Sequence, residues 1–493
     1  MATTNPLISG GVLFSSLLCL LFCSENACAY EGRVRGETME THHQQHSHVI
    51  KISDLLPAPV CSTSTSTPKG NINAKTLLKV VHKHGPCSKH GSKQKAKNHT
   101  PTQILLQDQS RVEMIKSRLT NASKGDQVQG SKATIPLHSG HSLGTGNYIV
   151  TVGIGSPQKD FSLVFDTGSD LTWIQCQPCV GSCYTQQEPI FNPSKSSSYS
   201  NITCKAKECS SLKSAPFIAT GCTSSTTCLY AIQYRDQSYS VGYFASETLT
   251  IKSSDVFHKF MFGCGENNDG LFGRTAGLLG LGRYNISMIS QTYKKYGGLF
   301  SYCIPSTSSS TGYLAFGHKG NTISSEVKFT PLLVNSKYPS FYFLDLIGIS
   351  VGRDKLPINE SVFATSGTLI DSGTVITRLQ PSAYSALRSS FRQSMSSYPM
   401  ADALSILDTC YNFTGYDTIT IPKIALNFRG GIAVDIDGTG IMYVRTIDQV
   451  CLAFAGNSDA GNIAILGNSQ QKRLDLIYDI AKNRLGFGPG GCN

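Results

Sequence analysis

The hydrophobic and polar positions divide the chain into three stretches with different patterns. An apolar run extends from Val12 to Phe22, and a polar stretch rich in His, Lys, Gln and Ser follows it to about Ala133. Beyond Lys132 come short runs of alternating residues, such as Tyr148–Ile154, separated by Gly, Pro and Asn. This alternation predicts half-buried strands. We therefore expect an all-β body with minor helices.

Helical spacing occurs at only a few places. In the body we expect helices over Ser287–Tyr296 and over Ser382–Tyr398, since the first is followed by two glycines and the second lies between two prolines. In the polar stretch, Leu77–His82 and Ile104–Leu119 are amphipathic. The second has apolar residues at helical spacing and charges on the other face, which predicts a helix that docks on another surface.

Residues 1–29 are typical of an export signal. The apolar run is too short for a comfortable membrane span, and the small residues Ala27-Cys28-Ala29 suit cleavage before Tyr30. A plastid transit peptide is the competing interpretation, weakened by the compact apolar block. We expect secretion, with the vacuole or chloroplast as alternatives, and no membrane anchor, because no second long apolar run or lipid-anchor tail follows.

The net charge of +11 belongs mostly to the polar stretch. Residues 30–133 hold 16 Lys and Arg against 7 Asp and Glu, whereas residues 134–493 hold 27 against 24. A nucleic-acid-binding role remains an alternative because of a run of lysines at positions 83, 89, 93, 95 and 97. Such runs are more often solvated, and no nucleic-acid-binding module accompanies this one. We therefore expect no nucleic-acid partner.

Twelve of the 17 cysteines lie in the body, and an even number in an exported protein predicts disulfides. A zinc cluster at Cys176, Cys179 and Cys183 is the alternative, disfavoured because no His lies between Cys176 and Cys228. We expect neither a metal nor a cofactor. Seven cysteines fall within 176–228, so at least one of them must pair outside this insert. Sequons predict glycosylation at Asn201, Asn285, Asn359 and Asn412.

The body contains a widely spaced internal repeat. Phe161–Ser169 ends in Asp-Thr-Gly-Ser, and Gly367–Thr374 ends in Asp-Ser-Gly-Thr, each after an apolar strand. An apolar-apolar-Gly element follows each copy, at Leu278-Leu279-Gly280 and at Ile465-Leu466-Gly467. Two halves with the same order of elements predict two similar lobes related by a pseudo-two-fold axis. A single Asp-Thr-Gly would indicate only a turn, but the doubled pattern is far less expected by chance.

The repeat can carry acid–base chemistry. A carboxylate between apolar strands is costly to bury unless it is hydrogen-bonded. The glycines Gly168 and Gly373 let backbone amides approach, and Ser169 and Thr374 offer hydroxyl donors. Across a two-fold axis, two carboxylates would share one proton, so that one activates water and the other protonates the substrate carbonyl. The predicted catalytic pair is Asp166 and Asp371.

These motifs, with the ending Ile477–Phe487, resemble the pepsin-type aspartic protease family over about residues 148–488. The insert after Trp173 and the leader sequences Val80–Cys87 and Gln107–Arg111 resemble its plant nepenthesin-like branch, which includes chloroplast-nucleoid DNA-binding relatives. The resemblance implies a bilobal pepsin-like fold with the active site between two β lobes. The implied domains are a signal peptide (1–29), a propeptide (30–133), an N-terminal lobe (134–335) and a C-terminal lobe (336–493).

The resemblance also implies roles for single residues. Thr167 and Ser372 should join the two active-site loops through hydroxyl-to-backbone bonds. Tyr234 should be the tyrosine of a flap over the cleft, with Trp173 supporting it; a packed strand Tyr and a core Trp are the plainer interpretations. The flap departs from the usual Tyr-Gly-x-Gly-Ser, because Arg235 and Gln237 replace the glycines. The resemblance implies a disulfide between Cys410 and Cys451. We also expect Cys303 to pair with Cys492, which would leave Cys264 to pair with a cysteine of the insert.

These observations lead to one functional hypothesis. We expect a monomeric aspartic endopeptidase, secreted as a zymogen and active in acid, whose partners are polypeptide substrates and its own propeptide. The leader holds eight of the twelve histidines, so acidification should add charge and loosen it. A leader used only for folding or sorting is the competing interpretation of residues 30–133. Two further functions compete with the protease hypothesis. One is a catalytically silent inhibitor or binding protein on the same scaffold, which would usually lack one Asp loop, and the second is a plastid nucleoid DNA-binding protease.

Overall fold

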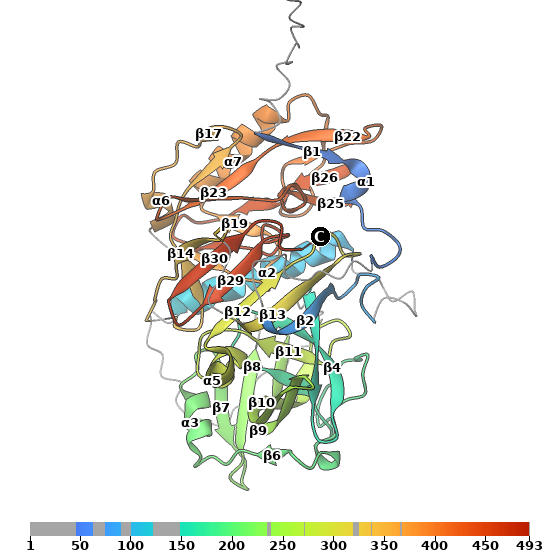
Figure 1. Ribbon diagram of the computed structural model, residues 1–493, viewed down its shortest axis with the longest axis vertical. Helices are drawn as coiled ribbons and strands as arrows, with labels where there is room; N and C mark the ends of the chain where they lie inside the picture. Colours follow the sequence, from blue (N-terminus) through green and yellow to red (C-terminus); the bar gives the residue numbers. More distant parts are fainter. Residues whose placement is uncertain are drawn as a thin grey trace, which may run out of the picture. The chain divides into compact units, whose positions relative to one another are not determined.

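Strands supply most of the regular structure, as the alternating pattern predicts. The computed structural model describes residues 46–62, 74–89, 100–121, 148–233, 238–270, 272–318, 325–336, 338–364 and 367–492. Within these ranges the largest sheet has 15 strands, and the remaining strands form smaller sheets of two to five strands (Figure 1). Short alternating runs form these strands because one face of each can pack on a core while the other meets solvent or a neighbouring element.

The repeated motifs occupy equivalent places in two sheets. In the first half, β4 (Lys159–Asp166) lies parallel to β11 (Gly277–Gly280), which also pairs with β5 (Trp173–Gln175). In the second half, β18 (Thr368–Ile370) lies parallel to β28 (Ala464–Leu466), which also pairs with β19 (Thr377–Leu379). Each half therefore carries the Asp loop and the apolar-apolar-Gly element on adjacent parallel strands. The fold is mainly β and pepsin-like, with two related lobes, as expected.

Two leader segments join sheets of the body. The strand β2 (Ala74–His82) pairs with β13 (Thr311–His318) on one side and with β3 (Tyr148–Ile154) on the other. Its side chains alternate, since Leu78 and Val80 are buried whereas Leu77 is exposed. The strand β1 (Ser47–Lys51) pairs with β22 (Thr418–Pro422). The leader is therefore part of the folded body, where its sequence alone predicted only a docked helix.

That docked helix is α2 (Pro101–Asn121), which covers the predicted range Ile104–Leu119. Figure 1 shows it between green strands of the first half and orange to red strands of the second. The predicted helix at 287–296 is instead two short helices, α4 (Met288–Gln291) and α5 (Tyr293–Tyr296), capped at their outer ends by Ser287 and by Gly297 with φ +68°. The predicted helix at 382–398 is α7 (Pro381–Ser394), which ends four residues early.

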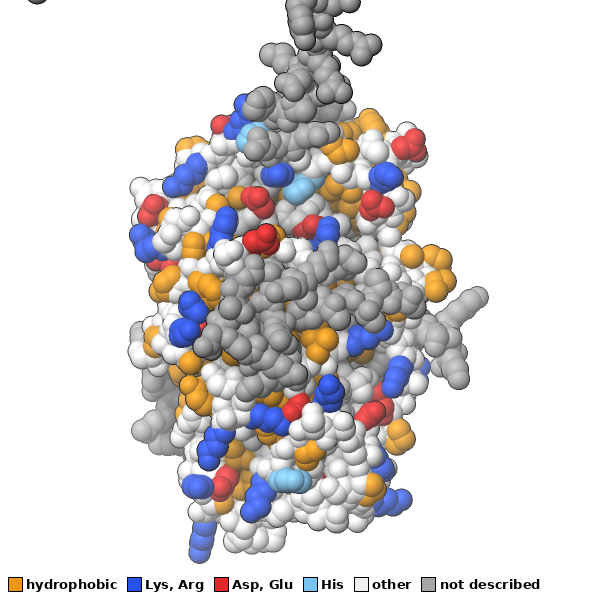
Figure 2. Space-filling model, in the orientation of Figure 1, with side chains coloured by type: hydrophobic (Ala, Val, Ile, Leu, Met, Phe, Trp, Pro, Cys, Tyr) orange, Lys and Arg blue, Asp and Glu red, His pale blue; other side chains and the backbone are white. Residues whose placement is uncertain are grey.

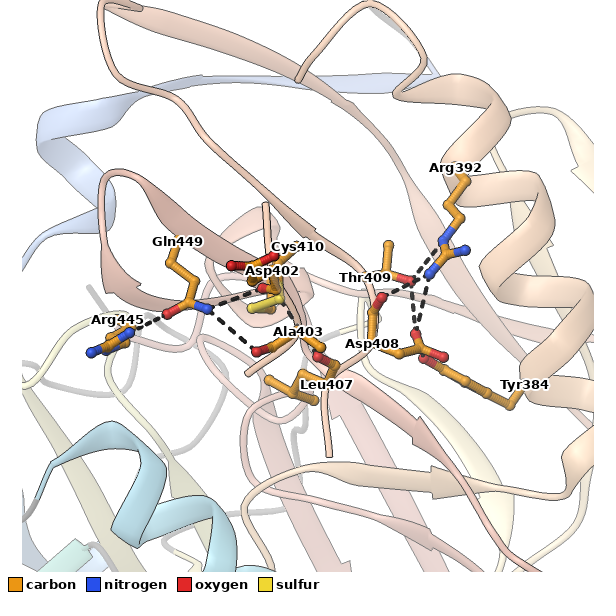
Figure 3. Close-up of a disulfide and its surroundings, with 11 residues drawn as sticks. Tyr384, Arg392, Asp402, Ala403, Leu407, Asp408, Thr409, Cys410, Arg445 and Gln449 are labelled. Atoms are coloured by element: carbon orange, nitrogen blue, oxygen red, sulfur yellow. Dashed lines mark hydrogen bonds and ion pairs between the residues drawn. A yellow bond between two sulfur atoms is a disulfide. The ribbon is translucent and has the colours of Figure 1, made fainter. Parts of the chain in front are cut away.

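Seven disulfides join the described cysteines, six of them within the body. The expected pairs 303–492 and 410–451 are both present, and Cys264 pairs with Cys176 of the insert. Cys410 and Cys451 lie opposite each other on β21 (Cys410–Tyr411) and β26 (Gln449–Leu452), beside polar contacts to Asp408 and Gln449 (Figure 3). The remaining pairs are 61–87, 179–183, 204–222 and 209–228.

The three cysteines of the zinc alternative, at positions 176, 179 and 183, are all disulfide-bonded. No group of three or more His, Cys, Asp or Glu residues suited to a metal occurs in the part of the chain that the structure describes. Of the helices in the described ranges, none is long and apolar enough to cross a membrane.

Candidate active site

The two aspartates of the repeat lie at equivalent turns and are bound in the same way. The Asp166 carboxylate accepts hydrogen bonds from the Gly168 N–H at 2.9 Å and from the Ser169 hydroxyl at 2.7 Å. The Asp371 carboxylate accepts from the Gly373 N–H at 3.2 Å and from the Thr374 hydroxyl at 2.5 Å. Both carboxylates are buried. Each loop thus supplies the donors that its sequence predicted.

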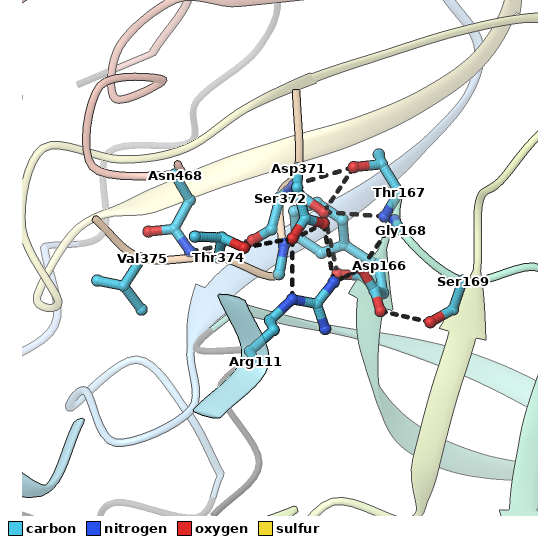
Figure 4. Close-up of polar contacts among 12 residues, drawn as sticks. Arg111, Asp166, Thr167, Gly168, Ser169, Asp371, Ser372, Thr374, Val375 and Asn468 are labelled. Carbon is cyan, nitrogen blue, oxygen red and sulfur yellow. Dashed lines mark hydrogen bonds and ion pairs between the residues drawn. The ribbon is translucent and has the colours of Figure 1, made fainter. Parts of the chain in front are cut away.

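The two loops are tied together by reciprocal hydrogen bonds. The Thr167 N–H donates to the Ser372 Oγ at 3.0 Å, and the Ser372 N–H donates to the Thr167 Oγ1 at 2.9 Å. These are the hydroxyl-to-backbone bonds expected of this pair, and Figure 4 shows the two loops facing each other through them. Because all four groups are buried, an unpaired donor here would cost about 1–3 kcal/mol. The pairing therefore fixes the spacing of the two aspartates.

Arg111 of α2 occupies the space between the two carboxylates (Figure 4). Its Nη2 lies 2.7 Å from the Asp166 Oδ1 and 2.8 Å from the Asp371 Oδ1, and its Nε donates to the Asp371 Oδ2 at 2.8 Å. The Arg111 side chain is 9% exposed and the Asp166 and Asp371 side chains are at most 1% exposed. One leader cation is therefore bound by both members of the predicted catalytic pair.

The glycines of both loops make this approach possible. A Cβ added at Gly373 would lie 2.3 Å from the Arg111 guanidinium, and one at Gly168 would lie 2.8 Å from it and 2.7 Å from the Asp371 carboxylate. Any side chain at either position would therefore push the guanidinium out.

The charges in this cluster stabilise one another. Burial would raise the pKa of Asp371, but the charge of Arg111 and the hydrogen bonds from Arg111 and Thr374 outweigh it, so the pKa lies below its ordinary value. Burial also opposes the charge on Arg111, whereas the two aspartates raise its pKa well above the usual range. The docked site therefore favours the ionised form of Asp371 as long as the guanidinium is present.

The helix α2 packs against both halves of the chain. Its Leu105 lies in a cluster with Val375 of the second half, whereas its Val112 and Ile115 lie in a cluster with Leu171 of the first half. These three α2 side chains are at most 1% exposed. Burying each aliphatic side chain contributes about 1.5–3 kcal/mol. Apolar packing therefore holds the helix in place, in addition to the Arg111 ion pairs.

The structure describes only part of the expected flap. The strands β8 (Cys228–Gln233) and β9 (Tyr239–Lys252) form an antiparallel hairpin whose last described pair is Gln233 with Tyr239. Tyr234, Arg235 and Gln237 lie outside the described residues. Trp173 is fully buried and contacts Phe272 edge-on, with ring centroids 4.9 Å apart. The supporting role of Trp173 under Tyr234 stays a prediction.

The four sequon asparagines differ in exposure. Asn201, Asn285 and Asn359 are exposed, whereas Asn412 is half-buried and its Oδ1 accepts from the Thr414 N–H at 2.8 Å. An exposed asparagine is accessible to a glycosyltransferase, so the first three suit the predicted modification better than the fourth.

The lysine run is not a simple solvated patch. Lys83 is buried, and burial lowers its pKa to about 8. Lys89 is exposed, and Lys93, Lys95 and Lys97 lie outside the described residues. On the face drawn in Figure 2, the visible Lys and Arg side chains are scattered singly among polar and acidic ones. The expectation of a solvated run is therefore wrong for Lys83, which packs in the fold.

The sequence alone predicted no role for three charged residues that contribute to the site. Arg111 and Asp108 belong to a leader motif that indicates family alone, and Arg378 belongs to no motif. The sequence gives one indication that Arg378 is unusual. This cation interrupts the apolar run after Asp371, and it lies as far after Asp371 as Trp173 lies after Asp166 in the first copy of the repeat. The meaning of Arg111 and Asp108 depends on where α2 docks, which no local pattern encodes.

Comparisons with known proteins assign the family. The models for the N-terminal and C-terminal xylanase inhibitor domains match residues 148–318 and 341–489. An aspartyl protease family protein of Arabidopsis thaliana is 51% identical over 98% of this chain and 99% of its own length. The Arabidopsis thaliana aspartyl protease AED1 is 47% identical, covering 97% and 99% of the two chains. The aspartic proteinase nepenthesin-2 of Nepenthes gracilis is 37% identical, covering 71% and 78%.

Solved structures agree with the fold. A protein titled edgp superposes with a TM-score of 0.57 at 21% identity, covering 71% of this chain and 92% of that one. Basic 7S globulin from soybean superposes with a TM-score of 0.55 at 20% identity, covering 69% and 90%. The repeated Asp loops, their reciprocal bonds and the similarity along nearly the whole chain lead to one assignment. The chain belongs to the plant nepenthesin-like branch of the pepsin-type aspartic proteases, a family of aspartic-type endopeptidases.

Proposed function

We propose that this protein is the precursor of an acid-active endopeptidase whose leader, residues 30–133, keeps the catalytic pair inaccessible. The observation that carries the proposal is the Arg111 guanidinium bound between Asp166 and Asp371. Hydrolysis needs a water molecule and a peptide carbonyl at the two carboxylates. The guanidinium takes the hydrogen-bonding atoms that these two groups would use, so the precursor is latent.

Catalysis follows once α2 leaves. Without the cation, two adjacent carboxylates share one proton, since both cannot remain ionised at close range. The ionised aspartate removes a proton from water, and the resulting hydroxide attacks the peptide carbonyl carbon. The protonated aspartate gives its proton to the carbonyl oxygen, which yields a tetrahedral diol. A proton then passes to the amide nitrogen, and the C–N bond breaks to leave a carboxylic acid and an amine. Either of Asp166 and Asp371 can start as the base.

Two further features support a secreted enzyme rather than a silent scaffold. Both Asp loops keep their full set of donors, which a pure binding protein would have no need to preserve. Seven disulfides suit folding in an oxidising compartment. We therefore propose export of the precursor through the signal at residues 1–29, and cleavage of polypeptide substrates by a monomer.

The test is to express residues 30–493 and to follow chain length and peptide hydrolysis from pH 7 to pH 3. We expect an inactive protein at pH 7 that shortens in acid and then cleaves peptides. Asp166→Asn and Asp371→Asn should each remain full-length and inactive with unchanged thermal stability within a few degrees, because an amide cannot transfer the proton. A statine-type inhibitor should block hydrolysis, whereas a chelator should not. Full activity of the unshortened protein at pH 7 would contradict latency.

A further inference from the structure

The carboxylate of Asp108, one turn before Arg111 in α2, lies in a cradle of nitrogen donors from the second half of the chain. Its Oδ1 accepts from the Val375 N–H at 2.5 Å, and its Oδ2 accepts from the Ile376 N–H at 3.0 Å. The Arg378 Nη2 lies 3.0 Å from the same Oδ2. The Asp108 and Arg378 side chains are 0% and 1% exposed. These three donors form a buried binding site for one carboxylate.

The receptor side of this cradle is held by the enzyme body itself. Val375 and Ile376 directly follow the Asp371 loop, and the Arg378 Nη1 donates to the Ile376 carbonyl oxygen at 2.8 Å. The outer nitrogen, Nη2, instead faces α2, where it contacts both Asp108 and the Gln109 Oε1, the latter at 3.3 Å. The body therefore fixes the guanidinium, and the leader supplies the anion that faces it.

The internal repeat shows how unusual this cation is. Trp173 lies opposite Leu278, two residues before Gly280, and Arg378 lies opposite Ile465, two residues before Gly467. Arg378 thus stands in the second half where the first half has its buried tryptophan. An indole ring can be buried against apolar neighbours, whereas a guanidinium in such a place needs a carboxylate or water to offset its lost hydration.

Removal of α2 would leave the buried Arg378 guanidinium without its carboxylate partner. If the precursor opens as in the proposed function, on which this inference rests, Asp108 and Gln109 leave together with Arg111. Two N–H groups and one guanidinium then face the emptied cleft. We propose that they form a subsite for an acidic side chain of the peptide substrate, and that Asp108 occupies this subsite in the precursor as an internal stand-in.

The helix geometry gives the distance of the subsite from the cut. Arg111 marks the catalytic pair, and Asp108 lies three residues earlier, which is about 4.5 Å along a helix axis. An extended substrate advances about 3.3 Å per residue. The preferred Asp or Glu should therefore lie within about two residues of the cleaved bond.

The first experiment measures kcat/KM for paired fluorogenic peptides that differ only by Glu or Gln at one position, scanned over three residues on each side of the cut. The acid-treated full chain is used at pH 5.5, where a free Glu is ionised. We expect one position at which Glu is favoured by about tenfold, as suits a buried charge-assisted bond. The preference should vanish in Arg378→Gln and return at least in part in Arg378→Lys. The matched control Arg388→Gln removes a cation on α7, where Arg388 pairs with Asp408, and should keep the preference.

A second experiment needs no catalysis. Asp108→Ala in the full chain empties the cradle, so formate should raise the melting temperature of this variant more than chloride does at equal ionic strength. The wild type, whose cradle is filled, and the double variant Asp108→Ala/Arg378→Gln should not show this difference. An absent formate effect would overturn the anion site itself.

The two experiments separate the possible failures. Hydrolysis with no Glu preference, or with a preference that survives Arg378→Gln, would overturn the subsite and leave the protease proposal standing. Hydrolysis of no peptide at all would overturn the proposed function and, with it, the substrate role of the cradle.

Discussion

Replacing Arg111 with alanine should release latency near neutral pH. The guanidinium makes three contacts of 2.7–2.8 Å to two carboxylates that are at most 1% exposed. Removing one partner of a buried ion pair costs about 3–5 kcal/mol, because the other charge stays buried. The aspartates can limit this loss by sharing a proton. We therefore take about 3 kcal/mol as the change in docking free energy, which is roughly a 100-fold larger open population.

The assay compares full-length precursors, with residues 30–493, in a fluorogenic peptide assay at pH 6.5. Arg111→Ala should hydrolyse the peptide roughly 100 times faster than the wild type before any chain shortening is visible. Arg111→Lys keeps a cation and should remain far more latent. Leu106→Ala, on the same helix but at a side chain that is 50% exposed, controls for helix damage. Equal latency of Arg111→Ala and wild type would refute the role of the guanidinium.

The direction of the pH effect follows from the pKa shifts. The pKa of Asp371 lies below its ordinary value in the docked state, whereas the opened pair shares one proton, so docking releases a proton from the pair. Docking therefore weakens as the pH falls through the pKa at which the opened pair takes up that proton. Two partly buried histidines of the leader add to this effect. His82 and His48 have lowered pKa values, chiefly through burial, so both are held neutral when docked. Their contribution is complete above pH ~6.5 and is lost as the pH falls.

Three more outcomes follow. Burial and the nearby charges of Lys83 and Lys472 lower the pKa of His82 to about 3, so this side chain should contribute up to about 2 kcal/mol to acid opening at pH 5. His82→Phe should therefore lower the pH midpoint of activation, measured by chain shortening and peptide hydrolysis, and an unmoved midpoint would contradict this. Ile115→Ala should weaken docking by about 2–5 kcal/mol and raise hydrolysis at pH 6.5, whereas unchanged latency would mean that apolar packing does not hold α2. Cys61→Ser with Cys87→Ser opens a loop of 26 residues, which should destabilise the folded leader by about 3 kcal/mol. Limited proteolysis should then cut the leader faster than in the wild type, and equal rates would mean that β1 and β2 alone hold the leader in place.

The acid-release hypothesis takes a more specific form with these contacts. The sequence suggests that a positively charged leader gains further charge, and loosens by repulsion within itself, when its histidines titrate. In the structure, the leader contributes a strand to the largest sheet, and burial holds two of its histidines neutral. The release that we expect is therefore driven by the cost of burying charged imidazoles, and less by repulsion within the leader.

Local pattern and repetition were enough to predict the class of fold and the position of the two aspartates. Alternation identified strands such as β3, and helical spacing identified α2, because these periods are properties of the chain itself. Asp166 and Asp371 could be singled out because the same short motif occurs twice after an apolar strand. The helix over 287–296 was predicted as one element, but Thr292 interrupts it and divides it into two short helices.

Only the tertiary structure decided what binds the two aspartates. Arg111 lies 55 residues before Asp166 and 260 before Asp371, and Asp108 lies 267 residues before Val375. Nothing in a helix pattern tells which of its charged residues will face a partner so distant in sequence. The strand β2 was likewise not predicted from the sequence, because a strand is stable only when neighbouring strands bind its N–H and C=O groups. The sequence thus determined the chemistry of each loop, whereas long-range packing decided that the leader occupies it.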